Sequence, residues 1–134
     1  MRLPGWESLA PALAAAALAA LPGQARADIE CRFETECHEG ETCVESGFSV
    51  TVETALVPGT VFAEGGFPAG DRAVTDAESA EIGWAASGPA LAAFWSSRSG
   101  FHMLSFDAEG AARYSAHLPG AAHSVLHVGT CGTR

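Results

Sequence analysis

Histidine is the residue type in this sequence best suited to chemistry near neutral pH. The chain has five histidines, and four of them follow one another closely near the C-terminal end: His102, His117, His123 and His127. A neutral imidazole is a frequent ligand of zinc and copper, and the group titrates at about pH 6.5. The chemistry that these residues could do therefore depends on whether the fold brings their side chains together.

One turn that decides whether these histidines lie close together is expected at Pro119-Gly120. If residue 118 pairs with residue 122 across this turn, His117 lies directly opposite His123. Directly opposed residues of an antiparallel pair have Cβ atoms roughly 4.5–5.5 Å apart, close enough for two imidazoles to share one metal ion. This hairpin therefore predicts a pair of neighbouring histidines.

The second turn is expected between Asp107 and Gly110. If these two residues pair, His102 lies opposite Ser115 and next to His117, and strand alternation puts all four histidines on one face of the sheet. The four residues are therefore candidate ligands for zinc or copper. The other interpretations are a solvated sheet face and a pH-sensitive surface patch.

Four cysteines, Cys31, Cys37, Cys43 and Cys131, suit two disulfides rather than a zinc site, because no C-x2-C pair is present. Four cysteines allow three connectivities. Cys37 and Cys43 bracket a turn near Gly40, which favours the pairing Cys37–Cys43 with Cys31–Cys131. The pairing Cys31–Cys43 with Cys37–Cys131 remains as the alternative.

The N-terminal segment has the pattern of a helical signal peptide. Arg2 precedes an apolar run over residues 9–21, and Ala25-Arg26-Ala27 supplies the small residues that a signal peptidase needs. The run is shorter than the roughly 20 apolar residues of a membrane-spanning helix. We expect cleavage after Ala27, export to the bacterial periplasm or exterior, and a single domain over residues 28–134 without stable membrane insertion.

The composition indicates which partners the domain could bind. The chain has no lysine and a formal net charge of −9 at pH 7. Such a protein repels nucleic acid and favours a cationic protein or small ligand. We expect a monomer.

Period-two alternation indicates an all-β domain. It is clearest over residues 48–56 and continues over residues 72–76, 78–86, 91–97, 101–106, 111–118 and 123–131, with turn residues between these segments. The pattern predicts an antiparallel meander of about seven or eight strands, forming a closed or partly open barrel, with a β-sandwich as the alternative.

Motifs for catalysis are missing from the sequence. It has no Gly-x-Ser-x-Gly, no His-Glu-x-x-His and no glycine-rich phosphate loop before a helix. We therefore expect no enzyme activity and no cofactor, with an uncharacterised enzyme as a further alternative. Trp84, Phe94 and Trp95 are candidate partner-binding residues, and alternation places Phe94 and Trp95 on opposite faces of their strand.

A short stretch is similar to the C-type lysozyme inhibitors, which are small exported β-barrels. The similarity lies in Ser87-Gly88 followed by a strand with Phe94-Trp95, and it covers about ten residues. The family places a tyrosine and a lysine around these motifs, and this chain has neither there. The resemblance implies a barrel that binds a cationic protein. A non-enzymatic binding domain is the leading prediction, and a histidine-based metal-binding protein is its alternative.

Overall fold

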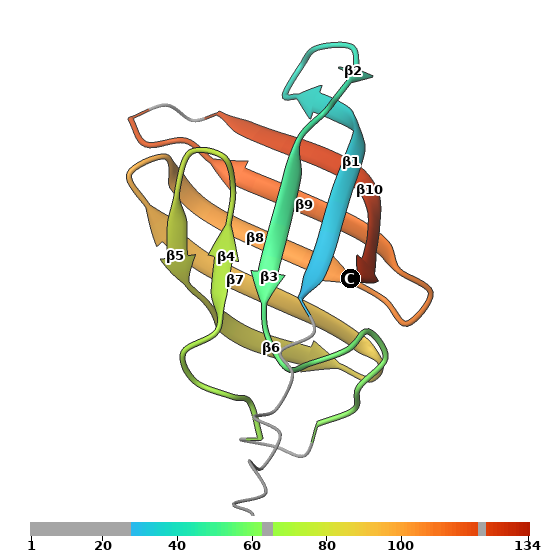
Figure 1. Cartoon of the computed structure of the whole chain (residues 1–134). Helices are drawn as coiled ribbons and strands as arrows, with labels where there is room; N and C mark the ends of the chain where they lie inside the picture. The colour runs from blue at the N-terminus through green and yellow to red at the C-terminus, as the bar shows by residue number, and fades with distance from the viewer. Residues whose placement is uncertain (1–27, 63–65, 121–122) are drawn as a thin grey trace, which may run out of the picture.

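The computed structural model describes residues 28–62, 66–120 and 123–134, and the predicted signal peptide lies outside these residues. The described residues form one antiparallel sheet in the order β5-β4-β3-β1-β10-β9-β8-β7-β6, and β2 pairs with β1 off this path. The sheet curls on itself, so that β1, β3, β4 and β5 cross in front of β6 to β9 (Figure 1). The prediction of an all-β, partly open barrel is confirmed.

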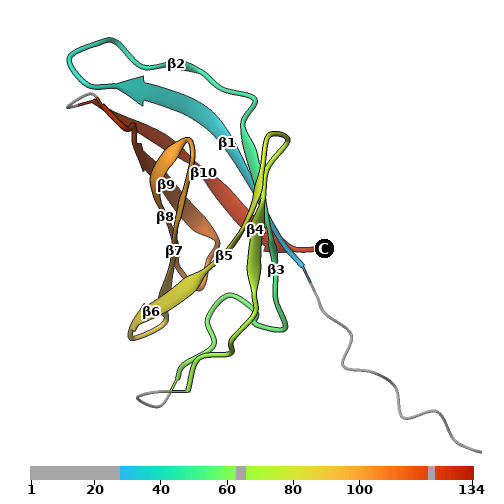
Figure 2. The same ribbon diagram turned by 90° about the vertical axis from the view of Figure 1, so that its left-hand side faces the viewer.

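The structure contains more strands than predicted. Their bounds are β1 Ile29–His38, β2 Val44–Glu45, β3 Ser49–Glu53, β4 Arg72–Val74, β5 Ser79–Glu81, β6 Gly83–Ser87, β7 Ala90–Ser97, β8 Gly100–Phe106, β9 Ala111–His117 and β10 Ser124–Thr133. The segment predicted as one strand over residues 78–86 is divided at Ile82, whose N–H donates to the carbonyl of Asp71. β5 and β6 are therefore the two unpaired edges at which the barrel stays open (Figure 2).

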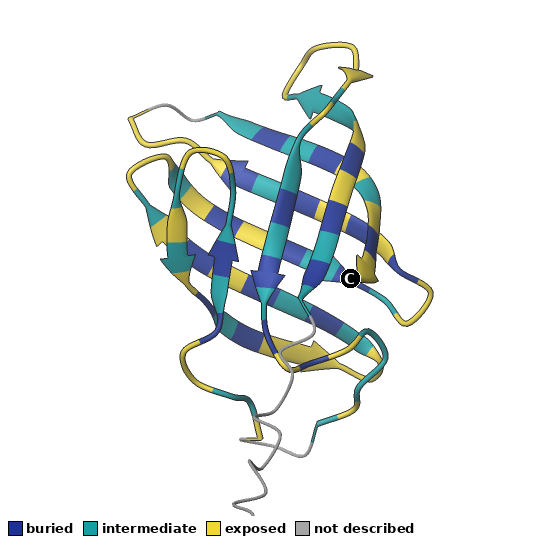
Figure 3. Ribbon diagram, in the orientation of Figure 1, coloured by how far each residue is buried: buried dark blue, intermediate teal, exposed yellow. Residues whose placement is uncertain are grey.

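Alternating burial along the strands produces the core. Buried and exposed positions follow one another along β1, β7, β8 and β9, which gives the banded pattern of Figure 3. Phe33, Leu91 and Leu104 are among the largest fully buried side chains, and together with their neighbours they fill the interior. No helix in the described part of the chain has the length and hydrophobicity needed to cross a membrane.

The two disulfides are Cys31–Cys131 and Cys37–Cys43, which confirms the favoured pairing. Cys31 lies directly opposite Cys131 in the ladder between β1 and β10, and the two residues are 100 positions apart in the chain. Closing a loop of this length stabilises a fold by roughly 4–5 kcal/mol in the chain-entropy model. Two disulfides are consistent with an oxidising, exported environment.

Both turns that were used to place the histidines differ from the prediction by one residue. Asp107 pairs with Ala111 rather than Gly110, because Gly110 has a left-handed φ of 89° and is accommodated inside a three-residue loop. Leu118 bonds to His123 rather than pairing with residue 122. A shift of one residue reverses the face on which every later side chain lies.

One end of the barrel, here called the closed end, is filled by Leu56, Ile82, Trp84 and Phe106. Buried Asp71 lies among them. Its Oδ2 atom accepts from Thr54 Oγ1 at 2.6 Å and from Trp84 Nε1 at 3.1 Å. The polar atoms of the closed end therefore serve to hold the β3–β4 loop against β6.

Candidate functional site

The opposite end of the barrel contains a cavity of about 340 Å³, here called the mouth. Apolar side chains form much of its wall. Its titratable lining comes from Glu36, Glu78, His102, Tyr114 and His127, and Thr75 and Ser99 add hydroxyl groups. The titratable residues belong to β1, the β4–β5 turn, β8, β9 and β10. The strand ends and loops around the mouth are acidic, because they carry Glu36, Glu39, Glu41, Glu45, Asp76 and Glu78 against one arginine, Arg98.

His102 is the centre of one hydrogen-bond network in the mouth. Its side chain is almost completely buried, and its Nδ1 atom lies 2.6 Å from the hydroxyl of Tyr114. Its Nε2 atom lies 3.0 Å from the hydroxyls of both Ser97 and Ser99, and 3.6 Å from Glu78 Oε1. The same Glu78 oxygen accepts from Ser97 at 2.8 Å and from Ser99 at 2.6 Å. This network joins the β4–β5 turn to the β7–β8 turn across the opening of the barrel.

His127 is the centre of a second network. Its Nδ1 atom lies 3.3 Å from Ser46 Oγ and 3.8 Å from Glu36 Oε2. Its ring packs against Phe48 with a centroid separation of 4.8 Å and against Tyr114 at 5.4 Å. Aromatic packing therefore connects the two networks and makes the floor of the mouth rigid.

Burial and hydrogen bonding shift the pKa values of the titratable groups in the mouth. Burial lowers the pKa of His102 and of His127, and the nearby carboxylates Glu78 and Glu36 offset this only in part. Burial raises the pKa of Tyr114 to about 12. Hydrogen bonds from Ser99 and Ser97 lower the pKa of Glu78. At pH 7 both imidazoles are therefore neutral, the phenol is protonated and Glu78 is ionised.

The arrangement of Ser99, His102 and Glu78 differs from that of a hydrolytic triad. In a triad the carboxylate accepts from the imidazole nitrogen that faces away from the serine, and the serine hydroxyl donates to the other nitrogen. Here Glu78 lies on the serine side and accepts the hydroxyl protons, while Tyr114 occupies the far nitrogen. The two arrangements therefore differ in which imidazole nitrogen lies near the carboxylate.

The structure separates the four histidines that were predicted to form one face. His102 and His127 point into the barrel, whereas His117 is exposed on the outside, and the prediction that the four share a face was wrong. The cause is the one-residue difference in each turn, which brings Ala116 rather than Ser115 opposite His102. No group of three or more His, Cys, Asp or Glu within the described ranges is placed to hold a metal ion.

His123 instead pairs with His38, which was not among the predicted ligands. His38 Nδ1 lies 3.1 Å from His123 Nε2, the two rings stack, and His38 Nε2 contacts Glu36 Oε1. This pair lies at the rim of the barrel, where β1 ends beside the start of β10.

The three predicted partner-binding aromatic residues lie in different surroundings. Trp84 and Trp95 are buried, and Phe94 is 40% exposed on the outer face of the barrel, so the expected opposition of Phe94 and Trp95 is confirmed. Trp95 stacks on His102 with a centroid separation of 5.2 Å. Trp95 therefore supports the floor of the mouth, while Phe94 and Trp84 lie away from it.

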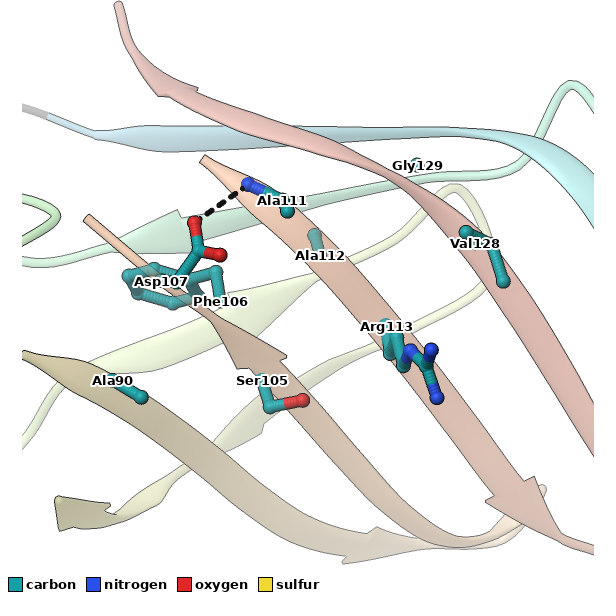
Figure 4. A pocket seen from close by; sticks show the side chains of 9 residues that line it. All are labelled: Ala90, Ser105, Phe106, Asp107, Ala111, Ala112, Arg113, Val128 and Gly129. Atoms are coloured by element: carbon teal, nitrogen blue, oxygen red, sulfur yellow. Dashed lines mark hydrogen bonds between the residues drawn. The ribbon is translucent and has the colours of Figure 1, made fainter. Parts of the chain in front are cut away.

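A second hollow lies on the outer surface of the sheet, across β7 to β10 (Figure 4). Ser105, Arg113 and Val128 stand side by side in it on neighbouring strands. Asp107 also lines it, but Asp107 Oδ1 already accepts from the N–H groups of Glu109 and Ala111. This outer groove lacks the buried titratable groups that make the mouth the better candidate site.

Comparison of the chain with protein-family models, with curated proteins and with solved structures finds no match.

Proposed function

We propose that the protein is a non-enzymatic binding domain that takes a cationic group into the mouth of its barrel. The observation that carries this proposal is the charge of the cavity lining. Glu36 and Glu78 line the mouth, both buried imidazoles are neutral at pH 7, and no arginine lines the cavity. A positive group entering the mouth meets only favourable or neutral partners.

The size of the mouth supports a small ligand or a single side chain of a protein partner. A cavity of about 340 Å³ is at the lower end of the range for small-molecule sites, which starts at about 300 Å³. Its apolar wall includes Phe48 and Val125, so the cation should carry an apolar body. The acidic segments around the opening would attract such a ligand from solution.

The test compares three ligands that share a benzyl group and differ in charge: benzylammonium, benzyl alcohol and benzoate. Calorimetric titration of the oxidised protein should give binding for benzylammonium that is at least tenfold tighter than for the other two. The double variant Glu36→Gln, Glu78→Gln should lose at least tenfold of this affinity. Glu109→Gln, which removes one negative charge from the exposed β8–β9 turn, is the control for loss of charge outside the mouth. Equal affinity for all three ligands would refute the proposal.

The protein-partner version is tested with a cationic enzyme of the class that the sequence resemblance suggests. If the mouth accepts a lysine or arginine side chain of lysozyme, added protein inhibits lysozyme, and the double variant inhibits it less. Undiminished lysozyme activity at a large molar excess of the protein would rule out this version and leave the small ligand.

A further inference from the structure

We infer that the mouth recognises its cation through N–H donors, so that it takes a primary ammonium or a guanidinium and discriminates against a fully alkylated ammonium. This inference rests on the proposed function and names the chemical class of the ligand. It follows from locating each proton in the mouth, because the number of free acceptors and donors decides what can bind there.

The proton of His102 lies on Nε2. Ser97 and Ser99 each have one hydroxyl proton, and both hydroxyls donate to Glu78 Oε1. Neither serine therefore has a proton left for His102, although both oxygens lie 3.0 Å from Nε2. A neutral imidazole has a single N–H, and here it must point from Nε2 toward these oxygens.

Tyr114 then has to donate to His102. With its proton on Nε2, His102 presents a lone pair at Nδ1, which lies 2.6 Å from the Tyr114 oxygen. The single phenolic proton fills this bond, and the high pKa of Tyr114 keeps that proton in place. The phenol oxygen retains lone pairs and has no further proton to offer, so it can act toward a ligand only as an acceptor.

His127 Nδ1 lies 3.3 Å from Ser46 Oγ, a hydroxyl that accepts the N–H of Phe48 and can still either donate to this nitrogen or accept from it. Nε2 of His127 makes no hydrogen bond to the described residues. No fully buried side-chain nitrogen or oxygen among those residues lacks a partner, so this atom is open to the cavity that His127 lines. Nε2 is thus a polar atom that faces the mouth and is free to bond to a ligand.

The ionisable lining of the mouth therefore presents three groups that act toward a ligand only as acceptors. They are the carboxylates of Glu36 and Glu78 and the phenol oxygen of Tyr114. An ammonium with three N–H groups, or a guanidinium with five, can satisfy several of them together. A trimethylammonium group has the same charge but covers these acceptors with methyl groups, which leaves them dehydrated and unpaired.

The experiment titrates the oxidised protein with benzylammonium and its N-methyl, N,N-dimethyl and N,N,N-trimethyl derivatives, which keep the charge and lose N–H donors one at a time. We expect the affinity to fall stepwise, with at least a tenfold difference between the first and the last ligand. Tyr114→Phe removes one acceptor and keeps the ring, and it should reduce this ratio at least threefold. Glu109→Gln should leave the ratio unchanged.

The outcomes separate the two levels of the proposal. If none of the four ligands binds, the proposed function itself fails. If the trimethyl ligand binds as tightly as benzylammonium, the proposed function stands and the donor requirement is overturned. A tenfold ratio that persists in Tyr114→Phe would also overturn it, because the discrimination would then come from ligand size. A thermal melt of this variant establishes that it is folded.

Discussion

The two ends of the barrel both contain buried polar side chains, but they use them differently. At the closed end, Asp71 accepts from Thr54 and from Trp84, and these bonds tie a loop to a strand. At the mouth, the phenol oxygen of Tyr114 keeps lone pairs and lines a cavity. Burial of a polar group therefore does not by itself indicate a binding site. A hydrogen-bond acceptor that is still free and lines a cavity does.

The largest loss of stability is expected from a substitution at the closed end. Asp71→Ala removes a buried acceptor and leaves the Thr54 hydroxyl and the Trp84 N–H without their partner. We expect the free energy of unfolding to fall by about 3 kcal/mol, since bonds to a carboxylate are worth about 1.5–3 kcal/mol each and do not add fully. Urea denaturation measures this loss. A change below about 1 kcal/mol would show that the closed end is not held by Asp71.

The second effect concerns the mouth. Tyr114→Phe removes one hydrogen bond to His102, so we expect a loss of about 1 kcal/mol in the free energy of unfolding. The affinity for benzylammonium should fall about tenfold, because an acceptor for the ligand is lost. Calorimetry and urea denaturation of the same variant provide the two values. If the variant were less stable but bound benzylammonium with unchanged affinity, Tyr114 would have only a structural role, as Asp71 has at the closed end.

The third effect is a dependence on pH. The pKa values of His102 and His127 lie below the usual value of 6.5, so the unfolded chain binds more protons than the folded one as pH falls below 6.5. Stability from this source is therefore complete above pH 6.5 and is lost as pH falls through the two folded pKa values. Benzylammonium binding should weaken over the same range, since protonated imidazoles repel a cation.

Thermal melts and titrations between pH 5 and pH 8 test this dependence. The charged groups that face the two histidines are Glu78 for His102, and Glu36 and His38 for His127. His127→Phe removes one titrating group, so the variant should lose less stability between pH 7.5 and pH 5.5 than the parent protein does. An equal loss in both proteins would assign the pH dependence to other groups.

The smallest effect is expected on the outer surface. Phe94 is exposed on the outer face of the barrel and lies directly opposite Met103. The polar lining of the mouth, in contrast, faces the interior of the barrel. Phe94→Ser should change the free energy of unfolding by about 0.5 kcal/mol or less. It should leave the affinity for benzylammonium within twofold of the parent value in the same calorimetric assay. A tenfold loss would move the binding site to the outer face.

Much of the fold could be predicted because the strands alternate clearly and the turns carry glycine and proline. The pairing of Cys37 with Cys43 followed from the turn between them, and Cys131 was left for Cys31. The division at Ile82 could not be foreseen, because it depends on a bond to the distant carbonyl of Asp71.

The site was harder to predict than the fold. Gly110 has a left-handed backbone and lengthens its turn by one residue, which reverses the facing of Tyr114 relative to His102. Because of that shift, the pairing expected from the sequence put His117, rather than Tyr114, on the face of His102. Glu78 was missed for another reason, since only the curvature of the sheet brings the β4–β5 turn against Ser97. The acidic composition is the signal from which a cationic ligand was predicted.

The central claim is that the mouth, rather than the outer groove or the closed end, binds the cation. Mapping amide chemical-shift changes by nuclear magnetic resonance during a benzylammonium titration tests it most directly. We predict saturable changes at Glu36, Glu78 and His127. Changes confined to Arg113 and Val128 of the outer groove, or to the residues around Asp71, would contradict the account.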